Sequence, residues 1–381
     1  MSERPIPYGH QWVDDEDIAA VVDVLRSDFL TTGPAVDAFE RGLEAATGAR
    51  RAVVVNSGTS ALHAMYFAAG LGPGDEIITT PLTFAATANA ALYLGASVRF
   101  VDVLPDTGNM DPAAAEAAIS DRTRLIVAID YTGHPADYDE LNAAAGERSV
   151  TVLADAAHSL GATYRGRRVG TLAHATELSF HPVKLITTAE GGAIVTDDEA
   201  LADRAARFRT HGITRDPALM ERNDGPWHYE QHDLGFNYRL TDVQAALGSS
   251  QLRRLDAFVA RRRAIAARYL EAWADLHALT LPVVREGVEP AWHLFVVRVS
   301  DAALRGAFFD RLRALGLGVQ VHYIPVHHHP YYRDLGFRPG SCPVAEDFSA
   351  RAVSLPIFPL MTDSEVERVI DAVRRAVFEL W

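Results

Sequence analysis

Lysine is almost absent from this sequence of 381 residues. Of its 36 lysine and arginine residues, Lys184 is the one lysine, and every other member of that set is an arginine. The guanidinium group of arginine stays charged in proteins, whereas a lysine amine can lose its proton and attack a carbonyl carbon. Lys184 is therefore either a chance survivor of a compositional bias or a position at which the protein requires an amine.

Four further absences narrow the class of protein. The single cysteine, Cys342, excludes an internal disulfide, and no apolar run approaches the roughly 18 residues of a membrane span. The first residues lack the apolar centre of a signal peptide. The formal charge of -14, without a basic run, argues against a nucleic-acid surface. We expect a cytoplasmic protein that binds neither nucleic acid nor a membrane.

Apolar segments alternate regularly through the first part of the chain. With 48% hydrophobic residues, the chain is long enough to bury a large core. The expected strands are too apolar to leave one face in water, which is typical of a mainly parallel sheet covered by helices on both sides. We predict strands at 52–56, 76–80, 97–101, 125–130 and 150–155, alternating with helices at 59–69, 85–94, 112–119 and 138–145.

The pattern changes after Gln244, where the expected helices become longer and rich in arginine. We predict long helices over 251–276, strands at 293–299 and 319–322, and helices at 302–315 and 363–378. The predicted fold class is therefore α/β, with a large domain at 1–249 and a smaller C-terminal α+β domain at 250–381.

A phosphate-binding turn is expected where the first of these strands meets a helix. Ser57, Gly58 and Thr59 follow the apolar run 52–56 and open the helix at 59–69. A helix start offers free backbone N–H groups and the positive end of the helix dipole, which suit a phosphate monoester. The competing interpretation is simple capping of the helix by Ser57.

Two charged residues follow other expected strands. Asp155 ends a predicted strand, at the edge where open α/β sheets bind ligands, and its carboxylate either holds a ring nitrogen protonated or merely caps the next turn. Lys184 lies in a loop between strand-like runs at 176–180 and 193–196. A loop lysine between two buried strands is not a typical solvated one.

Two aromatic side chains complete the pattern. Phe84 follows a strand end and would stack on an aromatic cofactor, although a core position is the default for a single aromatic residue. His158 comes three residues after Asp155, where it would pack beside the same ring or serve a structural role. A phosphate cradle, a stacking aromatic, a ring-nitrogen acid and a lysine nucleophile, taken as one ordered set, are typical of a pyridoxal-phosphate site.

At these residues the sequence resembles the nucleotide-sugar aminotransferases of the DegT/DnrJ/EryC1/StrS family, within the fold-type I pyridoxal-phosphate enzymes. The resemblance covers nearly the whole chain. It is carried by the segments 8–9, 56–62, 155–158, 179–192, 235–248, 323–327 and 354–356. The segments 77–81, 86–89, 187–192 and 320–323 further resemble the branch that makes UDP-4-amino-4,6-dideoxy-N-acetyl-β-L-altrosamine for pseudaminic acid.

The resemblance implies roles for individual residues. Lys184 would carry pyridoxal 5′-phosphate as a Schiff base and shuttle protons, while Asp155 would pair with the pyridine nitrogen. The implied cofactor-binding residues are Ser57, Gly58, Thr59, Phe84, Asp155, His158, Ser179, Lys184 and Asn237. The implied substrate-binding residues are Tyr8, Asp28, Phe29, Leu30, Thr31, Ser57, Ser179, Asn237, Gln320, Val321, His322 and Tyr323. The family position held here by His158 is often glutamine.

The resemblance also implies the partners and the reaction. Family members are homodimers whose sites are completed across the interface, and Asn237 matches a position supplied by the partner chain. L-Glutamate would give its amino group to the cofactor, which would then aminate C4 of a UDP-4-keto-6-deoxy-N-acetylhexosamine. The alternative is another 3-keto or 4-keto nucleotide sugar, destined for an antibiotic, an O-antigen or an S-layer, because pocket shape rather than a motif sets that choice.

Other classes of protein compete with this one. A dehydratase of the same family would have histidine in place of Lys184, and a transcriptional regulator would need a DNA-binding appendage, for which we expect no room at the N-terminus. A non-catalytic sugar-nucleotide binding module would not need the ordered cofactor set. The run His327, His328 and His329 precedes a proline; consecutive histidines do not present one face, so we expect a loop beside the pocket and no metal site.

Overall fold

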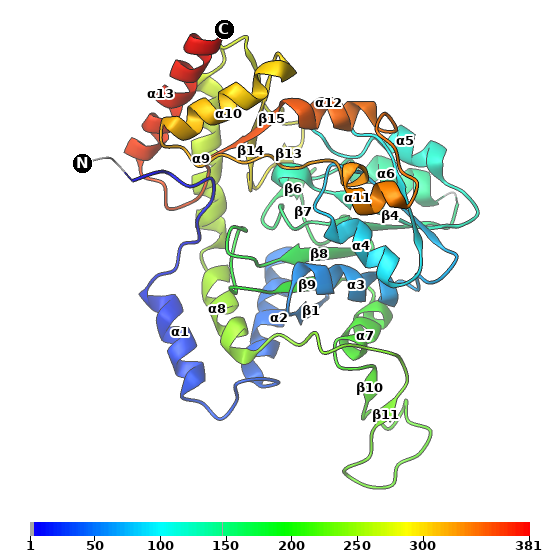
Figure 1. The fold of residues 1–381 in the computed structure, drawn as a ribbon. Helices are drawn as coiled ribbons and strands as arrows, with labels where there is room; N and C mark the ends of the chain where they lie inside the picture. The colour runs from blue at the N-terminus through cyan, green and yellow to red at the C-terminus, as the bar shows by residue number, and fades with distance from the viewer. Residues whose placement is uncertain (1–3, 147) are drawn as a thin grey trace.

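A seven-stranded sheet forms the centre of the computed structural model, which describes residues 4–146 and 148–381 (Figure 1). Its strands are β1 (Arg51–Val55), β2 (Glu76–Thr79), β3 (Ser97–Phe100), β4 (Thr123–Ile129), β5 (Thr151–Asp155), β8 (Ala175–Ser179) and β9 (Gly192–Thr196). Their order across the sheet is β1-β9-β8-β5-β4-β2-β3. Within this sheet β9 is antiparallel to both neighbours, and the remaining pairs are parallel, which confirms the mainly parallel sheet expected from the sequence.

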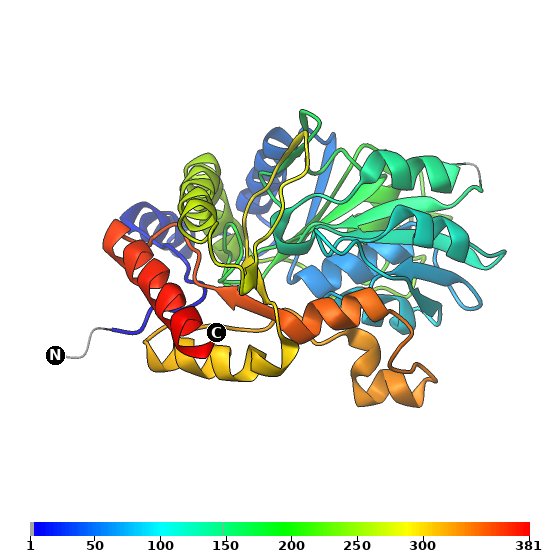
Figure 2. The same ribbon diagram turned by 90° about the horizontal axis from the view of Figure 1, so that it is seen from above.

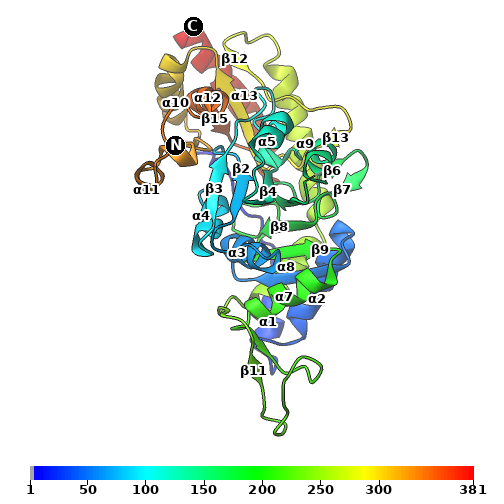
Figure 3. The same cartoon turned by 90° about the vertical axis from the view of Figure 1, so that its right-hand side faces the viewer.

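Helices cover both faces of this sheet (Figures 1 and 3). One face packs against α2 (Pro34–Thr47), α5 (Pro112–Ala118), α6 (Tyr138–Gly146) and α8 (Asp242–Leu252), and the other against α3 (Gly58–Ala68), α4 (Ala86–Tyr93) and α7 (Glu199–Phe208). Successive residues of a strand point to opposite faces, so Val54 packs in the first layer and Val53 in the second. Burial of both faces explains the unbroken apolar runs of the strands.

The first helices of the chain are attached to α8. The helix α1 (Asp15–Leu25) begins with a capping box at Asp14, and α2 begins directly after Gly33. The carboxylate of Asp242, at the start of α8, accepts hydrogen bonds from the backbone N–H groups of Gly33 at 2.8 Å and Ala35 at 2.9 Å. Because the first N–H groups of a helix have no partner within it, this buried acid supplies the acceptor that α2 lacks.

A smaller antiparallel sheet and its helices form the C-terminal domain (Figure 2). The sheet has the order β12 (Leu279–Thr280), β14 (Phe295–Val299) and β15 (Ala352–Leu355). It is accompanied by α9 (Leu255–Ala272), α10 (Arg305–Ala314), α12 (Pro343–Arg351) and α13 (Asp363–Leu380). In the core, Tyr269 stacks on Trp273 and meets Phe295 edge to face. Ile6, from the other end of the chain, packs in the same core.

The helices expected over 251–276 are the end of α8, which extends to Leu252, and α9, which begins at Leu255. One expectation for the C-terminal part is wrong. The segment 319–322 is not a strand: only Gln320 bridges to β15, whose other side is already paired with β14. The division between residues 249 and 250 stays a prediction, since α8 continues across it.

Short strands occupy the periphery. A three-stranded ribbon has the order β13 (Val288–Glu289), β6 (Thr163–Tyr164) and β7 (Arg167–Arg168). A second pair, β10 (Ile213–Thr214) with β11 (Glu230–Gln231), lies in an arm that projects from the large domain (Figures 1 and 3). Among the described residues, none of the helices combines the length and apolar character needed to cross a membrane.

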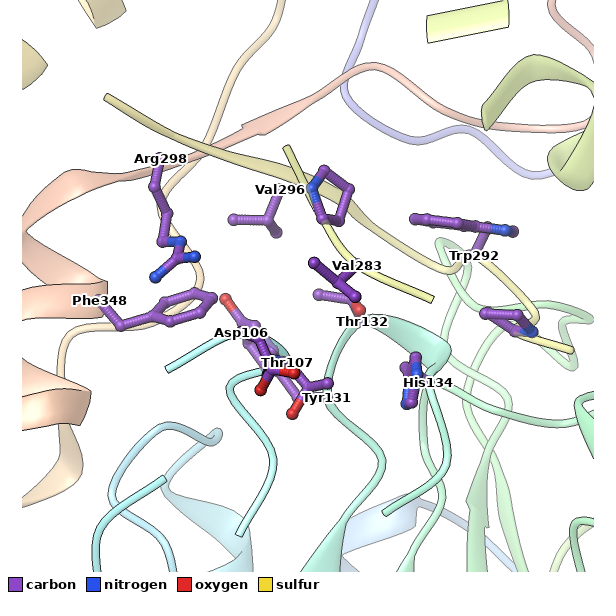
Figure 4. Close-up of a pocket in the computed structure, with 12 residues that line it drawn as sticks. Asp106, Thr107, Tyr131, Thr132, His134, Val283, Trp292, Val296, Arg298 and Phe348 are labelled. Atoms are coloured by element: carbon purple, nitrogen blue, oxygen red, sulfur yellow. Dashed lines mark hydrogen bonds between the residues drawn. The ribbon is translucent and has the colours of Figure 1, made fainter. Parts of the chain in front are cut away.

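A small cavity marks the junction of the two domains (Figure 4). Its volume is about 20 Å³, and its walls include Tyr131 and His134 on one side and Trp292 and Arg298 on the other. The guanidinium of Arg298 lies 4.4 Å from the centre of the Phe348 ring. A space of this size holds about one water molecule, so it is not a cofactor site.

Replacing Asp242 with alanine is expected to destabilise the protein. The change leaves the N–H groups of Gly33 and Ala35 without their acceptor, and each such loss costs about 1–3 kcal/mol. The midpoint of urea unfolding should therefore fall. Asp371→Ala, at an exposed position of α13, is the matched control and should change the free energy of unfolding by less than about 0.5 kcal/mol. Equal midpoints for the two variants would contradict this role of Asp242.

Candidate active site

A cavity of about 440 Å³ opens at the carboxyl ends of the parallel strands. Ser57 follows β1, Asp155 ends β5 and Ser179 ends β8, and all three line the cavity. His322 and Tyr323 close it from the C-terminal side. Both its volume and its place at the strand ends are typical of a small-molecule site in an α/β fold.

The start of α3 forms a cradle at one end of the cavity. Ser57 caps the helix, because its Oγ accepts a hydrogen bond from the Ser60 N–H at 3.1 Å. Gly58 and Thr59 line the cavity, and the N–H groups of a first helical turn lack partners within the helix. A Cβ atom at Gly58 would lie 2.5 Å from Oε1 of Glu177 and 3.0 Å from Cβ of Ser179, so any larger residue would displace these side chains. Capping by Ser57 is thus confirmed, and the free N–H groups beside it suit a phosphate monoester.

Asp155 is a buried acid held in place by α4. Its Oδ2 accepts a hydrogen bond from Thr87 Oγ1 at 2.6 Å, and its Oδ1 accepts one from the Ala157 N–H at 3.3 Å. Thr87 Oγ1 in turn lies 3.0 Å from Thr83 Oγ1. These contacts fix the orientation of a carboxylate that lines the cavity, which is what pairing with a protonated ring nitrogen requires.

The loop that carries Lys184 is the connection of a β-hairpin. Strands β8 and β9 are antiparallel, with Ser179 opposite Gly192. Within the loop, the Phe180 carbonyl accepts hydrogen bonds from Thr187 Oγ1 at 3.1 Å and from the Thr188 N–H at 3.0 Å. A local hydrogen-bond network therefore orders the loop and sets the position of the lysine.

The environment of Lys184 favours a free amine. Burial lowers the pKa of its amine below the ordinary value, while the carboxyl groups of Glu177 and Asp155 act in the opposite direction. Since desolvation is the largest of these effects, a larger fraction of the amine is unprotonated near neutral pH than in water. An unprotonated amine is the form that attacks a carbonyl carbon.

Aromatic and imidazole rings line the cavity around these groups. The Tyr323 hydroxyl lies 3.0 Å from His158 Nε2, and Phe84, 64% exposed, also lines the cavity. Burial lowers the pKa of His322 to about 4, and burial likewise lowers the pKa of His158 well below its usual range. Both imidazoles are therefore neutral at physiological pH and add no positive charge beside Lys184.

The structure brings together most of the residues expected at the site. The predicted residues that line the cavity are Tyr8, Ser57, Gly58, Thr59, Phe84, Asp155, His158, Ser179, Lys184, His322 and Tyr323. Val321 lines an adjoining groove instead. The predicted residues outside the cavity of their own chain are Asp28, Phe29, Leu30, Thr31, Asn237 and Gln320. Their assignment to the substrate, or of Asn237 to the cofactor, stays a prediction.

Other residues that line the cavity are not predicted from the sequence. Thr87, Glu177 and His293 line it together with His181 and Glu190. Thr87 stands one helical turn after Thr83, yet nothing in that spacing indicates a carboxylate partner. Glu177 lies inside a strand, where a charged residue among apolar neighbours is the one sequence signal that marks it.

Two of the three consecutive histidines meet one carboxylate. His327 Nε2 lies 2.8 Å from Glu346 Oε1, and His328 Nε2 lies 3.6 Å from its Oε2. His329 is not part of this group, so the three consecutive histidines do not all meet the same carboxylate. Glu346 also accepts hydrogen bonds from the Gly340 N–H at 2.7 and 2.9 Å. It thereby ties this loop to α12, while the absence of a metal stays a prediction.

The fold and this arrangement of cradle, acid and amine define a pyridoxal phosphate-dependent enzyme. The chain belongs to the DegT/DnrJ/EryC1/StrS aminotransferase family, whose model matches residues 11–374. Aminotransferases of this family use pyridoxal phosphate, and the chain is accordingly a sugar aminotransferase that needs an amino donor and a sugar substrate.

Relatives from several organisms match over almost their full length. Bacillus subtilis SpsC, a spore coat polysaccharide biosynthesis protein, is 40% identical over 377 residues, which cover 98% of this chain and 97% of the relative. Helicobacter pylori PseC, an aminotransferase involved in the biosynthesis of pseudoaminic acid, is 32% identical with a TM-score of 0.92, covering 99% of this chain and 100% of that chain. Spr1654 from Streptococcus pneumoniae, solved in a PMP-form, is 30% identical with a TM-score of 0.93 and the same coverage. It is also solved in a PLP-form.

Gly58→Ala is expected to weaken cofactor binding by roughly tenfold or more, which corresponds to about 1.4 kcal/mol. The added Cβ would contact Glu177 Oε1 and, at 3.0 Å, Ser179 Cβ, so that the phosphate cradle must shift. Titration of the cofactor-free protein with pyridoxal phosphate, followed by absorbance, gives the dissociation constant. Gly72→Ala is the matched control, since nothing lies within 4 Å of its added Cβ. Unchanged affinity in Gly58→Ala would contradict the cradle.

Proposed function

We propose that this enzyme transfers the amino group of L-glutamate to C4 of a UDP-4-keto-6-deoxy-N-acetylhexosamine, giving UDP-4-amino-4,6-dideoxy-N-acetyl-β-L-altrosamine. The observation that supports transamination most directly is the amine of Lys184 in one cavity with the Asp155 carboxyl and the α3 cradle. Pyridoxal phosphate, when bound, supplies the electron sink that stabilises the substrate carbanion.

Other residues that line the cavity would bind and orient the cofactor. Ser57, Gly58, Thr59 and Ser179 would hold the cofactor phosphate at the helix start. Asp155, fixed by Thr87, would keep the ring nitrogen protonated. Phe84 and His158 would flank the ring with an aromatic face and a neutral imidazole.

Lys184 would move the proton during the reaction. Its amine would be the base that takes the proton from the α-carbon of the amino donor, and the same group would hold that proton within the cavity. The step needs a neutral amine, and burial supports this by lowering the pKa of Lys184. The neutral His158 and His322 beside it are weaker bases than ordinary imidazoles, because burial lowers the pKa of both.

An adjoining groove supports a substrate as large as a nucleotide sugar. The groove measures about 460 Å³ and shares Thr83, Phe84 and Tyr323 with the cavity. Its wall includes Tyr331, which is 61% exposed and offers a flat aromatic face. The structural similarity to PseC, named for pseudoaminic acid biosynthesis, supports a sugar substrate of that pathway.

A second sugar substrate is favoured by a different observation. SpsC, with higher sequence identity than PseC, is named for spore coat polysaccharide biosynthesis. A 3-keto or 4-keto nucleotide sugar of a surface polysaccharide is therefore the alternative substrate. The two candidates share the same chemistry at Lys184 and differ in the shape of the sugar and the position of its carbonyl group.

We further propose a homodimer with shared active sites. Asn237 is exposed and lies outside the cavity of its own chain, as a residue that serves the partner would. Apolar side chains that precede it in the chain are open to solvent: Leu234 is 82% exposed, and Trp227, in the arm that carries β11, is 72% exposed. Exposed apolar surface is typical of protein contacts when it is contiguous.

A panel of keto sugars tests the proposed reaction. The purified enzyme, loaded with pyridoxal phosphate, is incubated with L-glutamate and UDP-linked or dTDP-linked 3-keto and 4-keto sugars, and the products are identified by NMR. We expect amination at C4 of the UDP-4-keto-6-deoxy-N-acetylhexosamine with the highest kcat/KM. Preferred amination of another sugar would overturn the substrate assignment while retaining the transaminase.

The Lys184→Arg variant, assayed with the same sugars, tests whether turnover needs the amine of Lys184. It keeps the charge and approximate bulk, and should lose at least about 100-fold in turnover because guanidinium stays protonated. In the wild type, borohydride treatment and peptide mapping should place the reduced cofactor on Lys184. Full turnover in the variant would contradict the assignment of the nucleophile.

Mixing two inactive variants tests the shared site. If Asn237 acts in the partner's cavity, Lys184→Ala and Asn237→Ala chains refolded together should form hybrids with one intact site, and activity should exceed that of either variant alone. Recovery is expected because the intact lysine and the intact asparagine then meet across the interface. If dimers shown to contain one chain of each variant recover no activity, Asn237 acts in the site of its own chain or in neither site.

A further inference from the structure

One buried carboxyl group in the cavity has no role in the reaction described above. Glu177 lies in β8, is 1% exposed and lines the cavity. In the parallel pairing of β5 with β8 it stands directly beside Asp155. Residues paired across neighbouring strands point to the same face of a sheet. Two carboxyl groups therefore occupy adjacent places on the cavity floor.

The far side of Glu177 meets the phosphate cradle. Its Oε1 lies 2.5 Å from the point where a Gly58 Cβ would stand, so the carboxyl group fills the space that this glycine leaves. Its Oε2 is buried and makes no hydrogen bond within the described part of the chain. A buried carboxylate oxygen without a donor is strongly disfavoured, whereas the neutral acid avoids the cost of a buried charge.

Burial and the nearest carboxyl group act in the same direction. Burial first, and the Asp155 carboxyl next, raise the pKa of Glu177 well above its usual range, and the Lys184 ammonium opposes them only in part. The remaining titratable neighbour on α3 is the Tyr66 hydroxyl, which carries no positive charge and whose own pKa is raised by burial. A cofactor phosphate at Gly58 would add about two negative charges beside Glu177.

We propose that Glu177 is a positioning residue that stays a neutral carboxylic acid in the cofactor-loaded enzyme and leaves Asp155 as the one ionised carboxyl on the cavity floor. An ionised Glu177 would repel the phosphate at Gly58 and hold the proton on Lys184. The neutral acid does neither, so cofactor binding and a free amine become compatible. The inference rests on the binding of pyridoxal phosphate at this site.

Infrared spectroscopy of the loaded enzyme detects the proton on Glu177. We expect the carbonyl stretch of a neutral carboxylic acid, sensitive to heavy water, in the wild type and its loss in Glu177→Gln. The spectra are compared in alkaline buffer, because burial also raises the pKa of Asp130, to about 7, and that acid must be ionised. Asp155→Asn should retain the band. Identical carbonyl regions in the wild type and Glu177→Gln would overturn the inference.

A pH titration of the bound cofactor's absorbance gives an independent readout. A negative charge close to Lys184 stabilises its cationic forms, so replacing an ionised Glu177 with glutamine would lower the titration midpoint by about 1–3 pH units. For a neutral Glu177 we expect a shift below about 0.5 unit. Asp155→Asn removes the carboxylate charge that would remain beside Lys184. This variant should shift the midpoint of the absorbance titration, which would show that the titration detects a nearby charge.

The outcomes separate this inference from the proposed function. If the wild type fails to bind pyridoxal phosphate at Lys184, both fall together. A second outcome is a wild type that binds the cofactor and aminates a sugar, but lacks the infrared band of a neutral carboxylic acid or shows a titration midpoint that Glu177→Gln lowers by about one pH unit or more. Only the inference about Glu177 is then overturned. A band that disappears with Glu177→Gln, together with an unmoved midpoint, supports it.

Discussion

The parallel pairing of β5 with β8 is the constraint on which the site depends. It places Asp155 and Ser179 at one edge of the sheet, and the hairpin from β8 to β9 carries Lys184 back over that edge. Backbone hydrogen bonds fix the register, and a slip of one residue would turn every side chain to the opposite face. The acid and the hydroxyl are therefore held by the strand ladder, and the amine is held by the hydrogen-bonded loop that this ladder anchors.

Burial favours the neutral amine of Lys184 at this edge of the sheet, but it also places two carboxyl groups close to that amine. Desolvation favours the neutral amine of Lys184, but two ionised carboxylates nearby would hold its proton in place. A neutral Glu177 resolves the conflict, because Asp155 then carries the charge needed at the ring nitrogen without a second anion beside the phosphate cradle. The protonation of one strand residue thus links cofactor binding to the basicity of the lysine.

The sequence predicts the parts of the site that are local in the chain. The strand, turn and helix around Ser57 and the strand end at Asp155 are recognisable because each signal lies within a few residues. Thr87 is not, since its partner Asp155 is 68 positions away and only the packing of α4 on the sheet joins them. Glu177 likewise gains its neighbours through strand pairing. Asn237 lies outside the cavity of its own chain, so a single sequence places it only by resemblance.

The scarcity of lysine has a chemical consequence in this fold. Elsewhere arginine meets the structural needs for positive charge: Arg209 pairs with Glu40 at 2.6 Å, and the buried Arg262 donates to the carbonyl of Ile357 at 2.8 Å. A guanidinium group serves such contacts well and stays protonated, so it does not condense with an aldehyde. Among the side chains of the protein, Lys184 is consequently the only primary amine that an incoming aldehyde meets. Selectivity for the reactive position is thus built into the composition of the chain as well as into the geometry of its cavity.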